Sequence, residues 1–268
     1  MNHLQYVHGY SSKEYKRLQD QAQTLTDLLH HDTIYPAESR VLEVGCGVGA
    51  QTMILAKNNP QNKIFSLDLS SESISTTKAR LEAAEYSNVS FLQADLFSLP
   101  FEDETFDHVF VCFVLEHLLN PRKALESLRR ILKTGGSLTV IEGDHGSAYF
   151  HPDSVAAKKT IQCLIDLQAK TGGNALIGRQ LYPLLSSASY KEVHVSPLMV
   201  YADESLPAMV EGFTKKTFNA MIEGIKEQAI NEKMIEEKEW NEGVSDLFRT
   251  SQKNSVFCYT FFKAVGIK

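Results

Sequence analysis

Long hydrophobic runs, clustered cysteines and an excess of basic charge are all missing from this chain of 268 residues. No apolar segment approaches the roughly 20 residues that a membrane helix requires, so we expect no membrane partner. Residues 1–5 lack the basic segment and apolar core of a secretory signal, which favours a cytoplasmic location. A formal net charge of −6 gives no broad basic surface, so we expect no nucleic-acid partner.

The four cysteines are widely spaced and include no C-x-x-C pair. This spacing argues against a disulfide framework and against a zinc site, and we expect no metal. Cys46 and Cys112 stand at the carboxyl ends of predicted strands, where we expect small buried residues that line a crevice. The length and the 43% hydrophobic content suit one large α/β domain with an appended subdomain.

A glycine-rich turn follows an apolar strand at residues 41–50, VLEVGCGVGA. Gly45, Gly47 and Ala50 match the G-x-G-x-x-G/A pattern of a nucleotide-binding turn, a pattern that also occurs by chance. Glycine suits such a turn because positive φ is required and because a missing Cβ lets the backbone approach a ligand. We expect a helix to begin near Gly49, with its unpaired amide groups directed at that ligand.

Two carboxylates at the ends of later strands narrow the choice of ligand. Asp68 ends a second apolar strand, close to the position where a carboxylate meets the ribose hydroxyls of an adenosine. Asp95 ends a third strand, where its carboxylate can accept a hydrogen bond from the adenine amine. The neighbouring Leu69 and Leu96 can cover the two faces of the adenine ring.

Four stretches of the chain resemble the class I S-adenosylmethionine (SAM)-dependent methyltransferases. They read LEVGCGVG, FSLDLS, LQADLFSLPFEDETFDHVFVCFVLEHLLNP and LRRILKTGGSLTVIE, and they cover roughly residues 40–142 in the family's order and spacing. The resemblance implies SAM as the cofactor, with Glu43 near the methionine amino group, Asp68 at the ribose and Asp95 at the adenine. The candidate cofactor-binding residues are Gln21, Glu43, Gly45, Cys46, Gly47, Gly49, Asp68, Leu69, Ala94, Asp95, Leu96 and Phe113.

Strands and helices alternate from residue 40, which indicates a parallel sheet with ligands at the carboxyl ends of its strands. With the resemblance, this order predicts a Rossmann-like α/β fold. Its seven-stranded, mostly parallel sheet has an antiparallel last strand between the fifth and sixth, and it carries an N-terminal helix and a helical insertion before the last strand. We expect Gly135 and Gly136 to end a helix and lead into the fifth strand. The predicted strands are 40–45, 63–68, 89–94, 106–113, 137–142, 192–195 and 255–262, and the predicted helices are 50–58, 71–85, 121–132 and 178–190.

We predict a single methyltransferase domain over residues 1–268. Its predicted parts are an N-terminal helical lid (1–35), a SAM-binding core (36–200), a helical substrate cap (201–252) and a final strand (253–268). The cap has charged amphipathic helices, and its run of Glu and Lys is expected to face solvent. Its possible packing positions are Phe213, Phe218, Met221, Ile225 and Met234.

The N-terminal helix is expected to follow a capping box made of Ser11 and Glu14. Its apolar positions recur every three or four residues and form one face. Two roles stay open for this helix: packing on the core, or closing over the cofactor as a lid. In the second role Arg17 or Gln21 reaches the methionine carboxylate.

The sulfonium methyl of SAM is already electrophilic, so the enzyme's main task is to place an acceptor in line with it. A general base is needed only where the acceptor carries a proton that must leave. The candidate catalytic residues are His117, Asp144 and His145, with Glu116 beside His117; for each, a purely structural role stays open. Aromatic and histidine residues that can line an acceptor pocket, or simply pack, are Tyr6, His8, Tyr10, Tyr149 and His151.

The sequence lacks the signatures of several methyltransferase subclasses. The Asn/Asp-Pro-Pro-aromatic motif of enzymes that methylate DNA bases or glutamine is absent after the fourth strand, as are the clustered acids of metal-dependent catechol enzymes. What remains resembles the group that acts on small molecules such as quinone rings, with a small-molecule acceptor as partner and a monomer or homodimer as assembly. The alternatives are a non-catalytic SAM-binding protein and an NAD(P)-dependent oxidoreductase.

Overall fold

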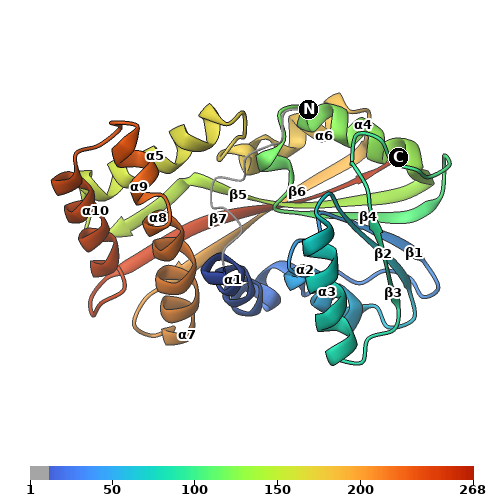
Figure 1. Ribbon diagram of the computed structural model, residues 1–268, viewed down its shortest axis with the longest axis horizontal. Coiled ribbons are helices and arrows are strands. Elements are labelled where there is room, and N and C mark those ends of the chain that lie inside the picture. Colours follow the sequence, from blue (N-terminus) through green and yellow to red (C-terminus); the bar gives the residue numbers. More distant parts are fainter. Residues whose placement is uncertain (1–11) are drawn as a thin grey trace.

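The computed structural model describes residues 12–268 and contains a seven-stranded sheet in the order β3-β2-β1-β4-β5-β7-β6 (Figure 1). The first five strands pair in parallel, and β7 pairs antiparallel with both β5 and β6. The predicted fold class is therefore confirmed, including the position of the last strand. The strands are β1 (Arg40–Val44), β2 (Lys63–Asp68), β3 (Val89–Gln93), β4 (Phe106–Cys112), β5 (Leu132–His151), β6 (Lys191–Ala202) and β7 (Val256–Ile267).

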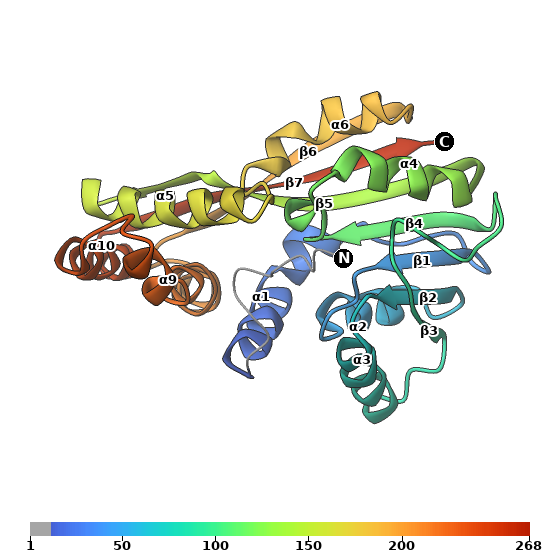
Figure 2. The ribbon, with the colours of Figure 1, turned by 45° about the horizontal axis from the view of Figure 1, so that its top comes forward.

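Helices cover both faces of the parallel part of the sheet, and Figure 2 shows α2 and α3 on one side with α4 and α6 on the other. Because both faces are covered, the central strands are mostly apolar. In β4, Val109, Phe110 and Val111 are all fully buried. These flanking helices are α2 (Ala50–Asn58), α3 (Ser71–Ala83), α4 (Pro121–Ile131) and α6 (Leu181–Ser187), with the short 3-10 helices η1 (Leu115–His117) and η2 (Ile177–Gln180).

The carboxyl-terminal part of β5 and the facing parts of β6 and β7 extend beyond the parallel strands and carry a second group of helices (Figure 1). This group buries Trp240, Phe213 and Phe218, which belong to one hydrophobic core with Phe257 and Tyr259 of β7. Its helices are α5 (Val155–Lys170), α7 (Pro207–Met209), the π-helix η3 (Val210–Asn219), α8 (Ala220–Glu223), α9 (Lys226–Asn231) and α10 (Glu237–Arg249).

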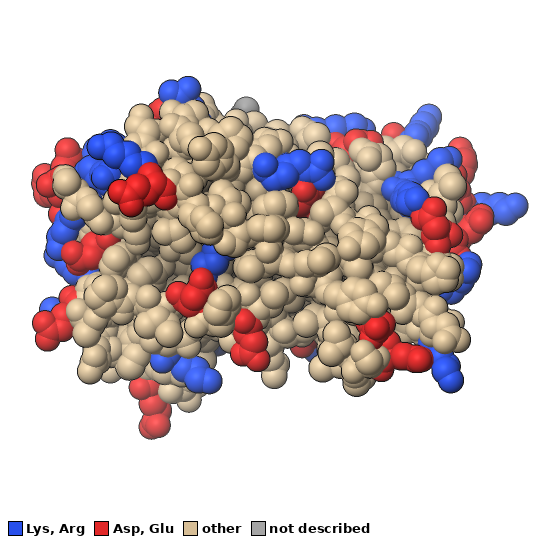
Figure 3. Space-filling view, turned by 180° about the vertical axis from the view of Figure 1, so that it is seen from behind, with Lys and Arg blue, Asp and Glu red and all other residues tan. Residues whose placement is uncertain are grey.

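The predicted packing positions of this insertion behave as expected for a core-facing surface. Phe213, Phe218, Met221 and Ile225 are buried, and Met234 is partly buried against the same core. Charged side chains of both signs lie interspersed on the face shown in Figure 3.

Several element boundaries differ from the predictions, and β6 and β7 are both longer than the predicted 192–195 and 255–262. Helix α4 ends at Ile131, so Gly135 and Gly136 do not stop it; they lie inside β5, where the pairing with β4 shifts register. Strand β5 is also far longer than the predicted 137–142, because its second half pairs with β7 rather than with the parallel strands. The predicted helix at 178–190 is a 3-10 turn followed by the short α6.

Helix α1 (Ser12–His30) lies between the two groups of helices (Figure 1). Its Leu25 and Leu29 are fully buried. Lys263 of β7 holds the end of α1, since its Nζ donates to the Leu29 carbonyl at 3.2 Å and also contacts Asp32. The predicted Ser11 cap and Tyr6, His8 and Tyr10 lie outside the described residues. Among residues 12–268, no helix is both long and apolar enough to cross a membrane.

Candidate functional site

A cavity of about 740 Å³ opens at the carboxyl ends of β1, β2, β3 and β4 and continues toward α5, η3 and β7. This volume is within the range of roughly 300–1,000 Å³ that is typical of small-molecule sites. Most of the predicted site residues line it. They are Gln21, Gly45, Cys46, Gly47, Asp68, Leu69, Ala94, Asp95, Leu96, Phe113, His117 and His145.

The glycine turn forms one end of the cavity and has the backbone that its sequence predicts. Gly45 and Gly47 have φ of 73° and 50°, in the left-handed region that favours glycine. A Cβ on Gly45 would collide with Val114, whereas one on Gly47 would meet no protein atom within 4 Å. The space over Gly47 is therefore open to a ligand that touches main chain.

Asp68 organises this turn from the end of β2. One carboxylate oxygen accepts the Gly47 amide at 2.9 Å, and the other accepts the Ser70 amide at 2.8 Å. Each oxygen keeps lone-pair capacity for a ribose hydroxyl. At the next strand end, Asp95 accepts the Phe97 amide at 2.9 Å and lines the cavity beside Leu96. These residues fit an adenosyl group.

Glu43 lies away from the lining, unlike the placement that the resemblance implies. Its side chain is 2% exposed and accepts a 2.6 Å hydrogen bond from Ser66. Burial raises the pKa of the Glu43 carboxyl to about 7, against the lowering effect of the Ser66 hydrogen bond. Gly49 also stands outside the lining; its left-handed backbone precedes α2 and packs on Thr77.

Helix α1 contributes a polar group to the cavity wall. Arg17 donates to both Glu14 oxygens, at 2.7 and 2.6 Å, and to the Gln21 side chain at 2.9 Å. All three side chains are buried and line the cavity. The predicted reach of Arg17 or Gln21 toward the methionine carboxylate is compatible with this position and stays a prediction.

The loop after β4 is held in an unusual conformation beneath the cavity. Phe113 has φ of 57°, which is rare for a bulky side chain and concentrates at functional sites. The buried Glu142 accepts the amides of Val114 and Leu115 at 3.0 and 2.7 Å. Burial, together with the nearby charge of Glu116, raises the pKa of Glu142.

A bulge in β5 brings His145 to the cavity. The pairing with β7 shifts register between Asp144 and Tyr149, and the Ser147 hydroxyl closes the bulge by accepting the Thr260 amide at 2.9 Å. Bulges often redirect a side chain beside a functional site. Here the His145 Nδ1 lies 2.7 Å from the Tyr259 hydroxyl.

Glu116 joins this pair from the loop after β4. Its carboxylate lies 3.9 Å from the His145 Nε2 and 3.6 Å from the His117 Nε2, and it accepts from the Gln168 amide at 3.1 Å. Burial opposes ionisation of Glu116, but His117, His145 and the Gln168 hydrogen bond together lower its pKa. Burial lowers the pKa of His145, against the opposing influence of Glu116.

Asp144, the third catalytic candidate, does not line the cavity. Its buried carboxylate accepts two hydrogen bonds from Arg179, at 2.5 and 2.8 Å. This two-point pairing is a strong structural contact.

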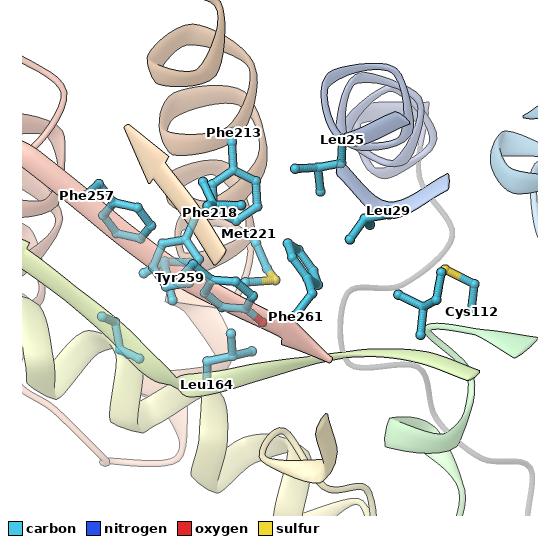
Figure 4. Close-up of a cluster of buried hydrophobic side chains, with 14 of the residues drawn as sticks. Leu25, Leu29, Cys112, Leu164, Phe213, Phe218, Met221, Phe257, Tyr259 and Phe261 are labelled. Carbon is cyan, nitrogen blue, oxygen red and sulfur yellow. The ribbon is translucent and has the colours of Figure 1, made fainter. Parts of the chain in front are cut away.

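The far end of the cavity is aromatic, and we call it the aromatic chamber. Figure 4 shows the rings of its apolar side gathered between η3 and β7. Tyr259 lies 4.8 Å from Phe261 and 5.5 Å from Phe213, measured between ring centroids. Its apolar side is Phe213, Phe218, Met221 and Phe261, and its polar side is Glu116, His145 and Tyr259.

The sequence interpretation did not single out Tyr259 or Phe261. Both lie in the predicted last strand, where alternation of side chains marks Phe257, Tyr259 and Phe261 as one face. That periodicity identifies a buried face but not its contact with a cavity. Tyr149 is 55% exposed and, like His151, does not line the cavity.

Residues 42–140 match the family model described as a methyltransferase domain. An uncharacterized methyltransferase of Schizosaccharomyces pombe is 32% identical over 174 residues, covering 62% of this chain and 62% of that protein. A demethylmenaquinone methyltransferase of Bacillus cereus is 34% identical over 105 residues, covering 39% of this chain and 44% of that protein. The chain thus spans less than two thirds of the length of these curated relatives.

Solved structures share the fold at low sequence identity. A phosphoethanolamine N-methyltransferase of Haemonchus contortus, solved with S-adenosylhomocysteine (SAH), has a TM-score of 0.57 and 15% identity, covering 93% of this chain and 52% of that one. The cyclase SpnF has a TM-score of 0.56 and 18% identity, covering 93% and 81%. One fold therefore carries more than one kind of reaction. Residues 42–140 therefore carry a methyltransferase domain, and the relatives and the sheet topology make the chain similar to the class I SAM-dependent methyltransferases, whose cofactor is SAM.

Proposed function

We propose that this protein transfers the methyl group of SAM to a small-molecule acceptor. The observation that supports this most directly is one continuous cavity that joins the glycine turn and Asp68 to the aromatic chamber, which we name the acceptor chamber from here on. A methyl donor and an acceptor can therefore be held next to each other inside one cavity.

Each end of the cavity has a distinct role in this proposal. The Gly47 backbone and Asp68 hold the methionine and ribose portions, while Asp95 and Leu96 hold the adenine. SAM supplies an electrophilic methyl carbon, and the chain's own residues orient the acceptor and exclude water. Helix α1 serves as the lid, and η3 with α8 forms the cap over the acceptor. We expect a monomer or homodimer with no nucleic-acid partner.

The acceptor group is open to several chemistries. The match to a demethylmenaquinone methyltransferase favours a quinone-like ring. A non-catalytic SAM-binding role is the second candidate, because the cofactor end of the cavity can bind SAM whether or not an acceptor is methylated. An NAD(P)-dependent oxidoreductase is the third candidate, because the glycine turn alone also fits a dinucleotide.

Ligand binding separates these candidates. Thermal unfolding is measured with SAM, SAH, NAD or NADP, all at about 100 times the SAH dissociation constant found by calorimetry, where a ligand of that affinity stabilises by about 2.7 kcal/mol. We expect stabilisation by SAM and SAH only. Stabilisation by NAD or NADP instead would refute the proposal. Binding of SAM without label transfer from methyl-labelled SAM to any of a broad acceptor panel would favour the non-catalytic role.

A further inference from the structure

The acceptor chamber has one apolar side that is built mainly from aromatic rings. Phe213 and Phe218 come from η3, and Phe261 comes from β7, so the rings approach the same space from two elements. Met221 adds a flexible thioether that adapts to the edge of a ring. Because these side chains are buried at 7% exposure or less, an occupant exchanges water for aromatic contact.

The opposite side of the acceptor chamber is an ordered chain of polar groups. The Glu116 carboxylate near Nε2 favours a proton on that nitrogen of His145, which leaves Nδ1 as an acceptor. The Tyr259 hydroxyl at 2.7 Å then donates to Nδ1. Gln168 holds Glu116 in place through a 3.1 Å hydrogen bond. The position of Glu116 therefore sets which nitrogen of His145 donates and which accepts.

Among these three polar groups, Tyr259 is the one that faces an acceptor. A Cβ at Gly143 would collide with the Tyr259 hydroxyl, so the glycine leaves the phenol oxygen its place at the cavity wall. A phenol oxygen that donates its own hydrogen can still accept one from a second hydroxyl. An acceptor hydroxyl that donates to the Tyr259 oxygen can therefore lose its proton through Tyr259 to His145.

Charged acceptors are poorly matched to the acceptor chamber. Among residues 12–268, the Lys and Arg side chains that line the cavity are Arg17 and Lys123. Arg17 is held by both oxygens of Glu14, and Lys123 lies in the first turn of α4, whose Ser127 bonds the Leu96 carbonyl at the adenine end. A phosphate or carboxylate beside Glu116 would therefore meet like charge.

We propose that the acceptor is an apolar, uncharged aromatic molecule bearing a phenol-like hydroxyl, and that Tyr259 is the catalytic residue that takes its proton. The inference rests on the proposed methyl transfer. The acceptor oxygen bonds to the methyl carbon as the sulfur–methyl bond breaks and sulfur keeps the electron pair. The acceptor proton passes to the Tyr259 oxygen while the Tyr259 proton passes to Nδ1 of His145. His145 and Glu116 are positioning residues, and Glu116 stabilises the imidazolium that results.

The pH dependence has a defined sign. His145 must be neutral to accept a proton, and burial lowers its pKa, so the relay works above that pKa and fails as pH falls through it. The groups that face His145 are Glu116, His117, Arg17, Asp144 and Tyr259. We expect an acid limb below pH 6.5 in wild type that is absent in Tyr259→Phe.

The test uses 2-naphthol and the more acidic 1-nitro-2-naphthol as probes, with the full chain. SAH binding is measured first by calorimetry; if wild type does not bind SAH, the methyl-transfer proposal fails, independently of this inference. With SAH present, we expect both naphthols to bind and 1-naphthyl phosphate not to bind. Tight binding of the phosphate, or no binding of either naphthol, overturns the acceptor class.

Two further readouts test Tyr259 itself. With SAM, Tyr259→Phe should lose about 100-fold in kcat with 2-naphthol but less than about 5-fold with 1-nitro-2-naphthol, whose more acidic hydroxyl needs less help from a base to lose its proton. Without turnover, the visible absorbance of bound 1-nitro-2-naphthol should show less ionisation across the acid range in Tyr259→Phe than in wild type.

The control is Tyr190→Phe, which removes another buried phenol whose hydroxyl bonds the Leu125 carbonyl outside the cavity. It should match wild type with both probes. Equal kcat losses of Tyr259→Phe for the two naphthols, or no methylation of either by wild type, overturns the relay.

Discussion

The two ends of the cavity are built in different ways. The cofactor end takes nearly all of its residues from residues 44–97, where each contact follows a strand end. The acceptor chamber gathers Glu116, His145, Phe213 and Tyr259 from four separate elements. A short local motif can thus define the cofactor end, whereas the acceptor chamber depends on how elements far apart in the sequence meet.

The largest effect is expected from removing an aromatic ring of the acceptor chamber. Phe213→Ala deletes a side chain that is 1% exposed, so urea unfolding should show a loss of about 3–5 kcal/mol. Affinity for 2-naphthol should fall with it, while SAH affinity should stay close to wild type. The matched control is Phe106→Ala, a fully buried ring outside the cavity, which should cost similar stability without changing naphthol affinity. A collapse of SAH binding in Phe213→Ala would show that the two ends are not separable.

The next effect concerns Glu43, which sits under the cofactor end without lining it. Its folded pKa of about 7 exceeds the ordinary value of 4.5, so the folded state binds more protons between these pH values. Stability should therefore decrease as pH rises from about 4.5 to 7, by about 3 kcal/mol in total. Glu43→Gln should remove this slope in urea unfolding at several pH values and should leave SAH affinity nearly unchanged. A large loss of SAH affinity would support the placement near the methionine amine that the resemblance implies.

A smaller effect is expected at Asp68. Asp68→Ala removes the acceptor of the Gly47 amide and the proposed ribose partner, and charged hydrogen bonds are worth about 1.5–3 kcal/mol each. SAH affinity measured by calorimetry should fall roughly 10- to 100-fold. Asp107→Ala is the control, because Asp107 also accepts a backbone amide, that of Arg40, but stands outside the cavity. Unchanged affinity in Asp68→Ala would contradict the assignment of the cofactor end.

The smallest effect separates backbone strain from ligand contact. Gly47→Ala and Gly135→Ala each place a Cβ at positive φ, with no protein atom within 4 Å, and each should cost about 1 kcal/mol of stability. Only Gly47 lines the cavity, so only Gly47→Ala should also weaken SAH binding, by about 10-fold. Equal SAH affinities in the two variants would mean that no ligand approaches the turn.

Local pattern was enough to predict the parallel core and much of the cofactor end. The strand that ends at Asp68 and the strand that ends before Asp95 can be predicted from the sequence. The alternation of apolar residues, the ends of strands and the positions of glycines all depend on neighbouring residues. The extension of β5 beyond Glu142 was not readable in the same way. It exists because β7 pairs with it, and pairing partners far apart in the chain leave no local signal.

Chain order was therefore enough to predict a Rossmann-like sheet, and it predicted that Gly47, Asp68 and Asp95 meet at one edge, since the carboxyl ends of parallel strands lie on one side. Only the folded molecule placed Tyr259 against His145 and moved Glu43 beneath the turn. The bulge at residues 145–148 and the antiparallel pairing of β7 bring Tyr259 to His145, and the hydrogen bond from Ser66 holds Glu43 in its buried position. Both depend on three-dimensional packing, in which residues more than a hundred positions apart become neighbours and a carboxyl group's surroundings decide whether it carries charge.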